Sequence, residues 1–417
     1  MLRTLLIVLG LACGGSLASQ NYTSYTIGNQ QDVDTLAQGG VCMMGGSTEQ
    51  DDAMRWFLQR ANGGDVLVLR ASGSDGYQDY LYNQLGVNVN SVETIVFENA
   101  NASNEAYVQD KISKAEAIWF AGGDQWKYVS YWRNSPVDSL INLGIKERGL
   151  VIGGTSAGMA ILGGYYFSAQ NGTITSEQAL SNPYNSRMQV DSAAFLEVAF
   201  LEEVITDTHY DNPDRKGRHL GFLAHNLVQY GASAKGIACD EYTAVCIDTS
   251  GLARVFGDHP TYDDNAYFLQ VNCELAEPEP EQFLSGSPLD WNRSGEAVKV
   301  YAIKGTTDGS KTFDLRDWQS GSGGNWEHWY VDNGQFQQSS GQAPNCLSAT
   351  PIDDNWKGEI MLFPNPMRHS LTISSDRPIT HIALFSLTGQ SMLEQPVLNQ
   401  KSYQLSVEDL PSGVYLA

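Results

Sequence analysis

The chain has 417 residues, of which 42% are hydrophobic, so it is long and apolar enough to form two or three domains with sizeable cores. Its 48 acidic and 25 basic residues give a formal net charge of −23. Because such a charge is repelled by phosphate groups, composition argues against nucleic acid or an anionic membrane as a partner.

Residues 1–19 have the pattern of a secretory signal peptide. Arg3 is followed by an apolar stretch over 4–13 and by small residues up to Ser19, which is too short for a permanent membrane span. A buried N-terminal strand is the alternative interpretation. Lipoprotein processing at Cys13 is disfavoured because residues 10–12, Gly-Leu-Ala, match that cleavage site poorly. We therefore expect a secreted protein, in which disulfides can form.

From residue 41 to residue 154, short apolar runs alternate with helical patterns. The expected strands lie at 41–44, 65–70, 92–97, 117–120 and 150–152. The first two expected helices cover 49–61 and 77–85, a third ends near residue 113, and a fourth follows residue 120. Apolar runs that alternate with helices are typical of a parallel sheet covered on both faces. We therefore predict an open, mostly parallel α/β sheet whose site lies at the carboxyl ends of its strands.

The run 149–160 reads GLVIGGTSAGMA and contains Gly154-x-Ser156-x-Gly158. This pattern is typical of a nucleophile elbow, in which a strand turns sharply into a helix and holds a serine in a strained conformation. An ordinary tight turn is the alternative. Glycine pairs at 45–46, 122–123 and 153–154 all follow expected strands. They indicate either close approach of a substrate or simple turns.

A serine nucleophile needs a base within hydrogen-bonding reach. Of the seven histidines, only His209 ends an expected strand, over 203–210, on the same rim as Ser156. His209 is therefore the predicted base, and an ordinary buried histidine is the alternative. The oxyanion hole would use the backbone N–H groups of Ala157 and Gly123.

The acid that orients the base is open among four carboxylates. We favour Glu177, because it gives the chain order serine, acid, histidine that is described for α/β-hydrolases. A solvated helix-cap glutamate is nearly as good an interpretation of that residue. The other candidates are Asp207, Asp240 and Glu241.

The second half of the chain contains further strands and a change of character. An amphipathic helix is expected through Tyr230, and several strands over 236–305 are expected to close the sheet in antiparallel fashion. We expect 306–342 to be a loop-rich surface elaboration packed on Trp318, Trp326 and Trp329. The α/β domain would then cover 20–345. A polar linker over 346–358 leads to a small all-β sandwich over 359–417.

The cysteines allow several disulfide arrangements. In one of them, Cys239 pairs with Cys246 across a hairpin, Cys273 pairs with Cys346, and Cys42 stays a buried thiol. None of them shows the Cys/His spacing of a zinc site. We expect no metal and no organic cofactor.

Several motifs, in order, carry a resemblance to a known family. They are FAGGDQ at 120–125, the GGTSAGMA run, Asp207-Thr208-His209 followed by Arg215 and Arg218, and GIACDEYTA at 236–244. Over residues 41–305 they are similar to the motifs of cyanophycinase and its relatives, the S51 serine peptidases, which have a glutamine-amidotransferase-like fold. The resemblance implies Ser156 as nucleophile, His209 as base and a glutamate after the elbow helix, for which Glu177 is the best match.

The resemblance also implies a substrate groove, which it assigns to Gln125, Asp207, Thr208, Arg215 and Arg218. The implied substrate is cyanophycin, a poly-aspartate bearing arginine on each side chain, from which the family releases β-Asp-Arg dipeptides. Two departures, Thr208 in place of glutamine and Pro213 in place of a first arginine, weaken that substrate assignment. For Arg215 and Arg218, a solvated basic helix face is the alternative.

Three functions are weighed against this one. An aspartyl dipeptidase with a different substrate fits the same motifs. A non-catalytic binding or scaffold protein on a peptidase fold, using 306–342 as its contact surface, is the alternative from another class. A glutamine amidotransferase is disfavoured because that chemistry uses cysteine where this chain has Ser156. Whether the chain forms a homodimer stays open.

The C-terminal module is similar to the sorting domain of type IX secretion cargo. The motifs are LFPNP at 362–366, LTI at 371–373, FSLTGQ at 385–390 and LPSGVY at 410–415. The resemblance implies the type IX secretion machinery as a partner and a location outside the cell or at its surface. Such domains usually continue for another strand, so we expect the module to be truncated at Ala417.

Overall fold

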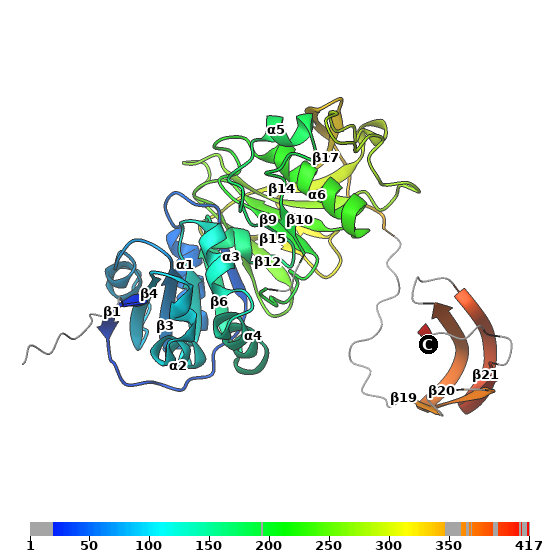
Figure 1. Cartoon of the computed structure of the whole chain (residues 1–417), viewed down its shortest axis with the longest axis horizontal. Coiled ribbons are helices and arrows are strands. Elements are labelled where there is room, and N and C mark those ends of the chain that lie inside the picture. The colour runs from blue at the N-terminus through cyan, green and yellow to red at the C-terminus, as the bar shows by residue number, and fades with distance from the viewer. Residues whose placement is uncertain are drawn as a thin grey trace, which may run out of the picture. The chain divides into compact units, whose positions relative to one another are not determined.

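The chain forms two compact units, residues 1–346 and 347–417 (Figure 1). The computed structural model describes residues 20–192, 195–346, 360–363, 367, 369–386, 391–407, 410 and 415–416. The predicted signal peptide lies outside the described residues, and so does the predicted linker apart from Cys346.

The first unit is built on a ten-stranded sheet with the order β1-β4-β3-β5-β6-β2-β11-β12-β15-β16. Its five central strands, β4-β3-β5-β6-β2, are parallel to one another, and the strands at both edges are antiparallel. The predicted open, mostly parallel α/β core is thus confirmed. The strands are β1 Tyr22–Gly28, β2 Val41–Met44, β3 Asp65–Arg70, β4 Ser91–Phe97, β5 Ala117–Phe120, β6 Val151–Thr155, β11 Ala244–Ile247, β12 Leu252–Phe256, β15 Lys311–Asp314 and β16 Gly321–Ser322.

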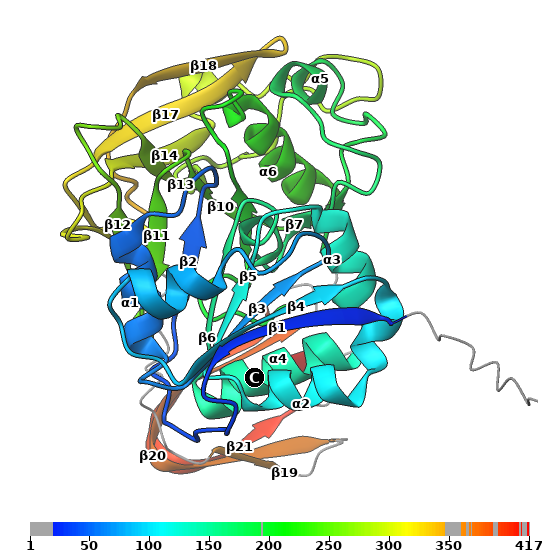
Figure 2. The ribbon, with the colours of Figure 1, turned by 90° about the vertical axis from the view of Figure 1, so that its left-hand side faces the viewer.

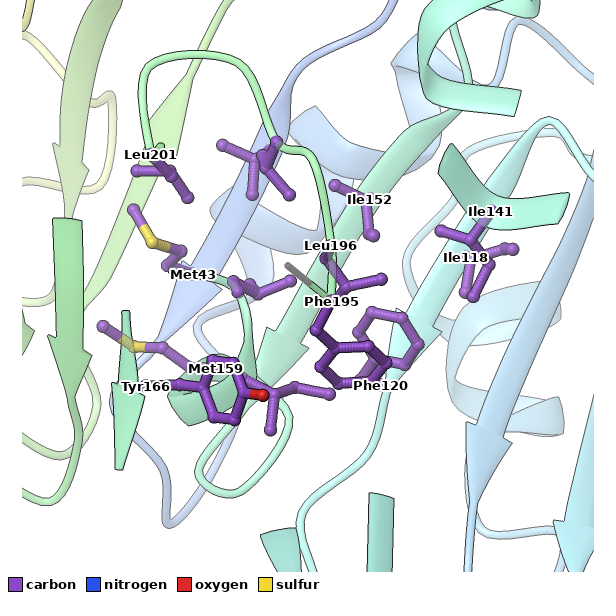
Figure 3. Close-up of a cluster of buried hydrophobic side chains, with 14 of the residues drawn as sticks. Met43, Ile118, Phe120, Ile141, Ile152, Met159, Tyr166, Phe195, Leu196 and Leu201 are labelled. Carbon is purple, nitrogen blue, oxygen red and sulfur yellow. The ribbon is translucent and has the colours of Figure 1, made fainter. Parts of the chain in front are cut away.

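Helices cover both faces of the parallel strands, which explains why nearly all residues of those strands are buried (Figure 2). Cys42 and Met44 of β2 share a buried cluster with helix α1 (Asp51–Arg60). Val41 and Met43, on the opposite face, share one with the other three helices. Figure 3 shows part of this second cluster, with Ile118 beside Ile141 of α4 and with Met43 and Ile152 among the other buried side chains. The three helices are α2 Ala106–Lys114, α3 Gln125–Trp132 and α4 Pro136–Arg148.

Local signals at both ends of α4 determine where β6 begins. Ser135 and Asp138 form a capping box at its start, and Pro136 occupies the first turn, where a missing N–H costs nothing. Gly149 ends the helix in the left-handed conformation, with φ of 65°. The chain then enters β6, which leads directly to Ser156.

A second sheet of six strands has the order β18-β17-β14-β13-β10-β9. Only β9 and β10 are parallel; the other pairs are antiparallel. Helix α6 (Lys216–Tyr230) packs against this sheet, and the short helix α5 (Ser176–Ser181) packs on α6. The strands are β9 Val204–Asp207, β10 Lys235–Cys239, β13 Asn265–Val271, β14 Val298–Lys304, β17 Asn325–Asp332 and β18 Gln335–Ser340, with a separate small pair β7 Tyr166–Phe167 and β8 Val190–Asp191.

This two-sheet arrangement corrects the expectation that the strands over 236–305 close a single sheet. After β10 the chain crosses at residues 240–243 into β11 of the first sheet, and it returns to the second sheet at β13. Strand patterns in the sequence show that strands exist but do not show which sheet each one joins.

Three further expectations need correction. Residues 306–342 hold four strands rather than loops, and Trp318 and Trp329 are buried in the cores of the two sheets. The helix expected at 77–85 is a short π-helical turn, Tyr80–Gln84. The helix expected after the elbow is a single 3-10 turn, Met159–Ile161.

The C-terminal unit is a four-stranded antiparallel sheet, as its all-β character predicts. Its order is β19-β20-β21, with β22 pairing with β20, and within the described residues the strands form one sheet. Residues 364–366 and 387–390, which belong to two of the sorting-domain motifs, lie outside the described residues. The strands are β19 Ile360–Phe363, β20 Ser370–Ser386, β21 Ser391–Ser406 and β22 Tyr415–Leu416.

The predicted Cys273–Cys346 disulfide is present, with its Cα atoms 5.6 Å apart. The predicted Cys239–Cys246 bond is wrong, since both residues are buried free thiols. The hairpin on which that prediction rested does not exist, because Cys239 ends β10 in one sheet and Cys246 lies in β11 of the other. Cys42 is a buried thiol, as expected.

Candidate active site

Ser156 lies in a strained turn immediately after β6. Its φ is 52°, and its N–H donates to the carbonyl of Met44 over 3.1 Å. A Cβ atom on Gly154 would lie 2.5 Å from the Gly158 carbonyl carbon, and one on Gly158 would lie 2.1 Å from the Phe120 oxygen. Only glycine fits both places. This is the elbow geometry that the G-x-S-x-G motif predicts.

His209 follows β9 and points at the serine. Its Nε2 lies 2.8 Å from Ser156 Oγ, and the backbone N–H of His209 donates to the Gly45 carbonyl over 2.7 Å. A Cβ atom on Gly46 would come within 2.4 Å of the imidazole ring. Gly46 therefore gives room to this histidine, and a Cβ atom on Gly45 would lie 1.9 Å from the Asp240 carbonyl oxygen, so the first glycine pair is explained without a substrate.

Glu241, rather than Glu177, is the carboxylate that contacts the histidine. Its Oε1 lies 2.6 Å from His209 Nδ1, and its side chain is only 16% exposed. Glu177 lies exposed in the first turn of α5, and no contact joins it to His209. Because β9 and β10 are parallel neighbours, the residues that follow them meet at one edge.

The order of residues along the chain is therefore a poor guide to which carboxylate contacts His209. Glu241, like His209, is a polar residue that follows an apolar run of the sequence, in this case 236–239. That signal was present in the sequence, and it outweighs the order of residues along the chain.

The hydrogen bonds assign the direction of the proton. A carboxylate can only accept, so His209 Nδ1 carries the hydrogen that is donated to Glu241. In the neutral ring Nε2 is then the acceptor, and it faces the hydroxyl of Ser156. The imidazole is thus held in the tautomer that can receive the serine proton.

The three residues come together at the seam between the two sheets. Ser156 belongs to the first sheet, while His209 and Glu241 follow strands of the second. A backbone hydrogen bond crosses the seam, since the His209 N–H after β9 donates to the carbonyl of Gly45 after β2 over 2.7 Å. The expectation that these groups share one edge of a single sheet is therefore corrected.

A buried acid precedes Glu241. Asp240 is 3% exposed, and its Oδ2 accepts from the Asn265 N–H at 2.8 Å, the Asn265 side-chain amide at 3.4 Å and the Tyr267 hydroxyl at 3.4 Å. Burial raises the pKa of Asp240 to about 7, and the nearby charges of Asp211 and Asp264 act in the same direction.

The predicted oxyanion donors lie beside the serine. Ala157 follows Ser156 directly, and a Cβ atom built on Gly122 would lie 3.5 Å from the Ser156 Cβ. The Tyr128 hydroxyl lies 2.9 and 3.0 Å from the carbonyl oxygens of Ala121 and Gly122, which fixes this turn. Among the described residues no hydrogen bond uses the N–H of Ala157 or of Gly123, so both are free to receive a negative charge.

Two of the predicted groove residues form an ion pair with each other. Asp207 and Arg218 are 2% and 4% exposed, and they form a two-pronged ion pair at 2.8 and 2.5 Å. Burial acts to raise the pKa of Asp207, but the charge and hydrogen bonds of Arg218 hold it below its usual value. Both side chains are too buried to contact a substrate, so the assignment of Asp207 and Arg218 as substrate ligands is corrected.

The other three predicted groove residues differ in what they can offer. Thr208 is 3% exposed, and its carbonyl accepts from Arg215 over 2.9 Å. Arg215 keeps a buried Nε without a partner in the described structure, and its side chain is 21% exposed. Burial, together with the charge of Arg218, lowers the pKa of Arg215. Gln125 is half-buried and donates to the Phe167 carbonyl over 2.8 Å.

The described residues hold neither a metal-ion cluster nor a helix that could cross a bilayer. They contain no group of three or more His, Cys, Asp or Glu side chains arranged to hold a metal ion. None of their helices combines the length and apolar character needed to cross a bilayer.

Comparison with protein families gives two matches. Residues 36–255 match the model of peptidase family S51, and residues 361–417 match that of the secretion system C-terminal sorting domain. The sorting domain directs the protein through type IX secretion to the cell surface or the extracellular space, and it implies contact with that secretion machinery.

Curated relatives are cyanophycinases at modest identity. Those of Synechococcus elongatus and of Thermosynechococcus vestitus are each 26% identical over 229 residues, which is 53% of this chain and 66% of the relative. The cyanophycinase of Geminocystis herdmanii is 29% identical over 149 residues, 36% of this chain and 49% of the relative. The chain thus spans between half and two thirds of the length of these relatives.

Two solved structures are similar to the chain at low identity. A peptidase from an acI-B1 Actinobacterium aligns over 67% of this chain and 98% of its own, with a TM-score of 0.43 and 14% identity. A putative peptidase E protein from Listeria monocytogenes EGD-e aligns over 53% and 100%, with a TM-score of 0.34 and 15% identity. Since the S51 model matches just over half of the 417 residues, including the whole of the Ser156, His209 and Glu241 site, the chain belongs to peptidase family S51.

Proposed function

We propose that this protein is a secreted serine peptidase in which Ser156 is the nucleophile, His209 the general base and Glu241 the orienting acid. The observation that carries the proposal is the unbroken hydrogen-bonded chain from Ser156 Oγ to His209 Nε2 at 2.8 Å and from His209 Nδ1 to Glu241 Oε1 at 2.6 Å. The backbone strain at the serine and the free N–H groups beside it support the same conclusion.

The proposed reaction follows from these positions. Ser156 Oγ attacks the substrate carbonyl as its proton passes to His209, and Glu241 stabilises the imidazolium that forms. The oxyanion accepts hydrogen bonds from the N–H groups of Ala157 and Gly123. His209 then gives the proton to the leaving amine, and a water molecule hydrolyses the acyl-enzyme by the reverse sequence of proton transfers.

For the substrate we propose aspartyl or β-aspartyl-arginine links, cleaved as an exopeptidase of cyanophycinase type. The names of the curated relatives support this choice. Arg215 supports it too, because its Nη1 donates to the carbonyl of Thr208, next to His209, and its side chain is 21% exposed, so the guanidinium can receive a substrate carboxylate. With Asp207 and Arg218 bonded to each other, Arg215 and Gln125 remain as the proposed groove residues. An aspartyl dipeptidase with another substrate would use the same triad.

The test is hydrolysis by the purified full chain. Cyanophycin, β-Asp-Arg and a panel of aspartyl dipeptides are offered to the unmodified protein, to Ser156→Ala and to the control Ser130→Ala on the exposed face of α3. We expect cleavage of at least one substrate, its loss in Ser156→Ala and its retention in the control. Full activity of Ser156→Ala would refute the nucleophile.

A fluorophosphonate probe gives an independent readout, since it labels only an activated serine. Labelling that disappears in Ser156→Ala together with no cleavage of the panel would retain the chemistry and reject the substrate class. The absence of both cleavage and labelling would favour a binding protein on a peptidase fold.

A further inference from the structure

A second pair of cysteines faces each other inside the first sheet. Cys42 of β2 and Cys246 of β11 are directly opposed in the antiparallel ladder, and their sulfur atoms lie 3.5 Å apart. Opposed residues of such a ladder have Cα atoms about 4.5 to 5.5 Å apart. That spacing falls inside the range of about 4.4 to 6.8 Å found in disulfides. The two residues therefore need little backbone movement to be bonded.

The surroundings of the pair favour a bond between the two sulfur atoms. Both side chains are fully buried. Apart from Cys246, the one contact described for the Cys42 sulfur is the Ala53 carbonyl at 3.9 Å. The sorting domain takes the protein out of the cell, and the chain already carries one disulfide, Cys273–Cys346. It thus reaches a compartment in which facing thiols become oxidised.

We propose that Cys42 and Cys246 form a second intrachain disulfide in the exported protein. The oxidant is a disulfide-carrying thiol oxidoreductase or a small-molecule disulfide. One thiolate attacks the disulfide of the oxidant and releases a thiol, and the other thiolate then attacks the mixed disulfide and releases the second thiol. The Cys42–Cys246 bond forms, the bond of the oxidant breaks, and two electrons and two protons pass to the oxidant. Because both sulfur atoms are buried in the folded sheet, the exchange takes place before β2 and β11 close on each other.

The bond would lock the seam that holds the active site. β2 leads directly into Gly45 and Gly46, which lie against His209, and β11 begins three residues after Glu241. A covalent link between these strands fixes the two loops relative to each other. The disulfide itself does not depend on the proposed peptidase activity.

The first test is a peptide map of the full chain after export. The protein is denatured in an alkylating reagent without reductant, digested and analysed by mass spectrometry. We expect the peptides of Cys42 and Cys246 to be linked and Cys239, the third buried thiol, to be alkylated. Alkylation of both Cys42 and Cys246, or a link from either to Cys239, would overturn the proposal.

The second test distinguishes a covalent Cys42–Cys246 bond from two unbonded thiols that are merely packed together. In a background in which Cys273 and Cys346 are both alanine, reductant should lower the melting temperature by about 5 °C or more. The added change Cys246→Ala should remove this effect of reductant, whereas Cys239→Ala should preserve it. An equal response to reductant with and without Cys246→Ala would refute the bond. If the multiple variants do not fold, the peptide map of the unmodified chain decides.

Discussion

Replacing Asp240 with asparagine should make the folded protein less sensitive to pH. The pKa of this buried carboxyl is about 7 in the folded protein and about 3.9 in an unfolded chain. Between these values the folded state holds a proton that the unfolded state has lost, so stability falls as pH rises, by about 1.36 kcal/mol per pH unit. The stability that the neutral acid contributes is fully present below pH 4 and is lost once pH exceeds 7.

Asparagine can reproduce the contacts of the neutral acid. All three donors that contact Asp240, the two of Asn265 and the Tyr267 hydroxyl, point at the single oxygen Oδ2. An amide oxygen can take that position, and the uncharged amide is free of the repulsion that Asp211 and Asp264 exert on an ionised acid.

The expected magnitude follows from the two pH units between 5 and 7. Over that interval the unmodified chain should lose about 2.3 kcal/mol that Asp240→Asn does not lose, because the carboxyl is already half ionised at pH 7. Urea unfolding of both proteins at pH 5, 6, 7 and 8, followed by tryptophan fluorescence, measures this difference. Eight of the nine tryptophans precede residue 347, so the signal reports mainly on the first unit.

The control is Asp75→Asn, an exposed carboxyl to which no side-chain hydrogen bond is made. It removes one negative charge, as Asp240→Asn does, but from an exposed position, so it controls for the loss of a charge. If the stability difference between Asp240→Asn and the unmodified chain were constant from pH 5 to pH 8, then Asp240 would not titrate near neutrality and the reasoning would fail.

Three further predictions concern the site and its support. Glu241→Gln should lower kcat by about 10⁴-fold in the hydrolysis assay, because an amide favours the wrong tautomer of the imidazole, whereas the matched change Glu177→Gln should leave kcat within about twofold; similar losses in both would reject the assignment. Gly46→Ala should lower kcat by about 100-fold or more, since its Cβ would come within 2.4 Å of the imidazole, and unchanged kinetics would show that the ring moves freely. Arg218→Met should lower the free energy of unfolding by about 3 to 5 kcal/mol in denaturant titrations, because the buried Asp207 loses both close hydrogen bonds to the guanidinium and keeps only the Arg215 contact at 3.9 Å; a change below about 1 kcal/mol would mean that the pair is unimportant for folding.

Local patterns in the sequence were sufficient to predict the parallel core. Asp65–Arg70 and Ala117–Phe120 are strands with the predicted bounds, because both faces of each are covered and the apolar run ends where the cover ends. The elbow was predictable for a similar reason: Gly154 and Gly158 are required by backbone contacts within a few residues of Ser156.

Features that depend on distant contacts could not be predicted from these patterns. Whether a strand joins the first or the second sheet depends on pairing partners far along the chain, and no local pattern records it. The same limit explains Arg218, which resembles a ligand in the sequence but lies within hydrogen-bonding distance of Asp207 in the fold. Glu241 is different, because its position after an apolar strand can be read from the sequence. That position is a better guide to the acid than the order of residues along the chain.

The Cys273–Cys346 bond has a mechanical consequence for a protein that carries a sorting domain. Cys346 is the last residue of the first unit, and the chain beyond it leads to the sorting domain. Tension applied through the tail enters at Cys346 and passes through the sulfur bridge to Cys273, just after β13. Strands β14 to β18 lie inside the closed loop between the two cysteines and carry none of that load. The edge strand β18 therefore cannot be peeled from its sheet by a pull on the tail while the bridge is intact.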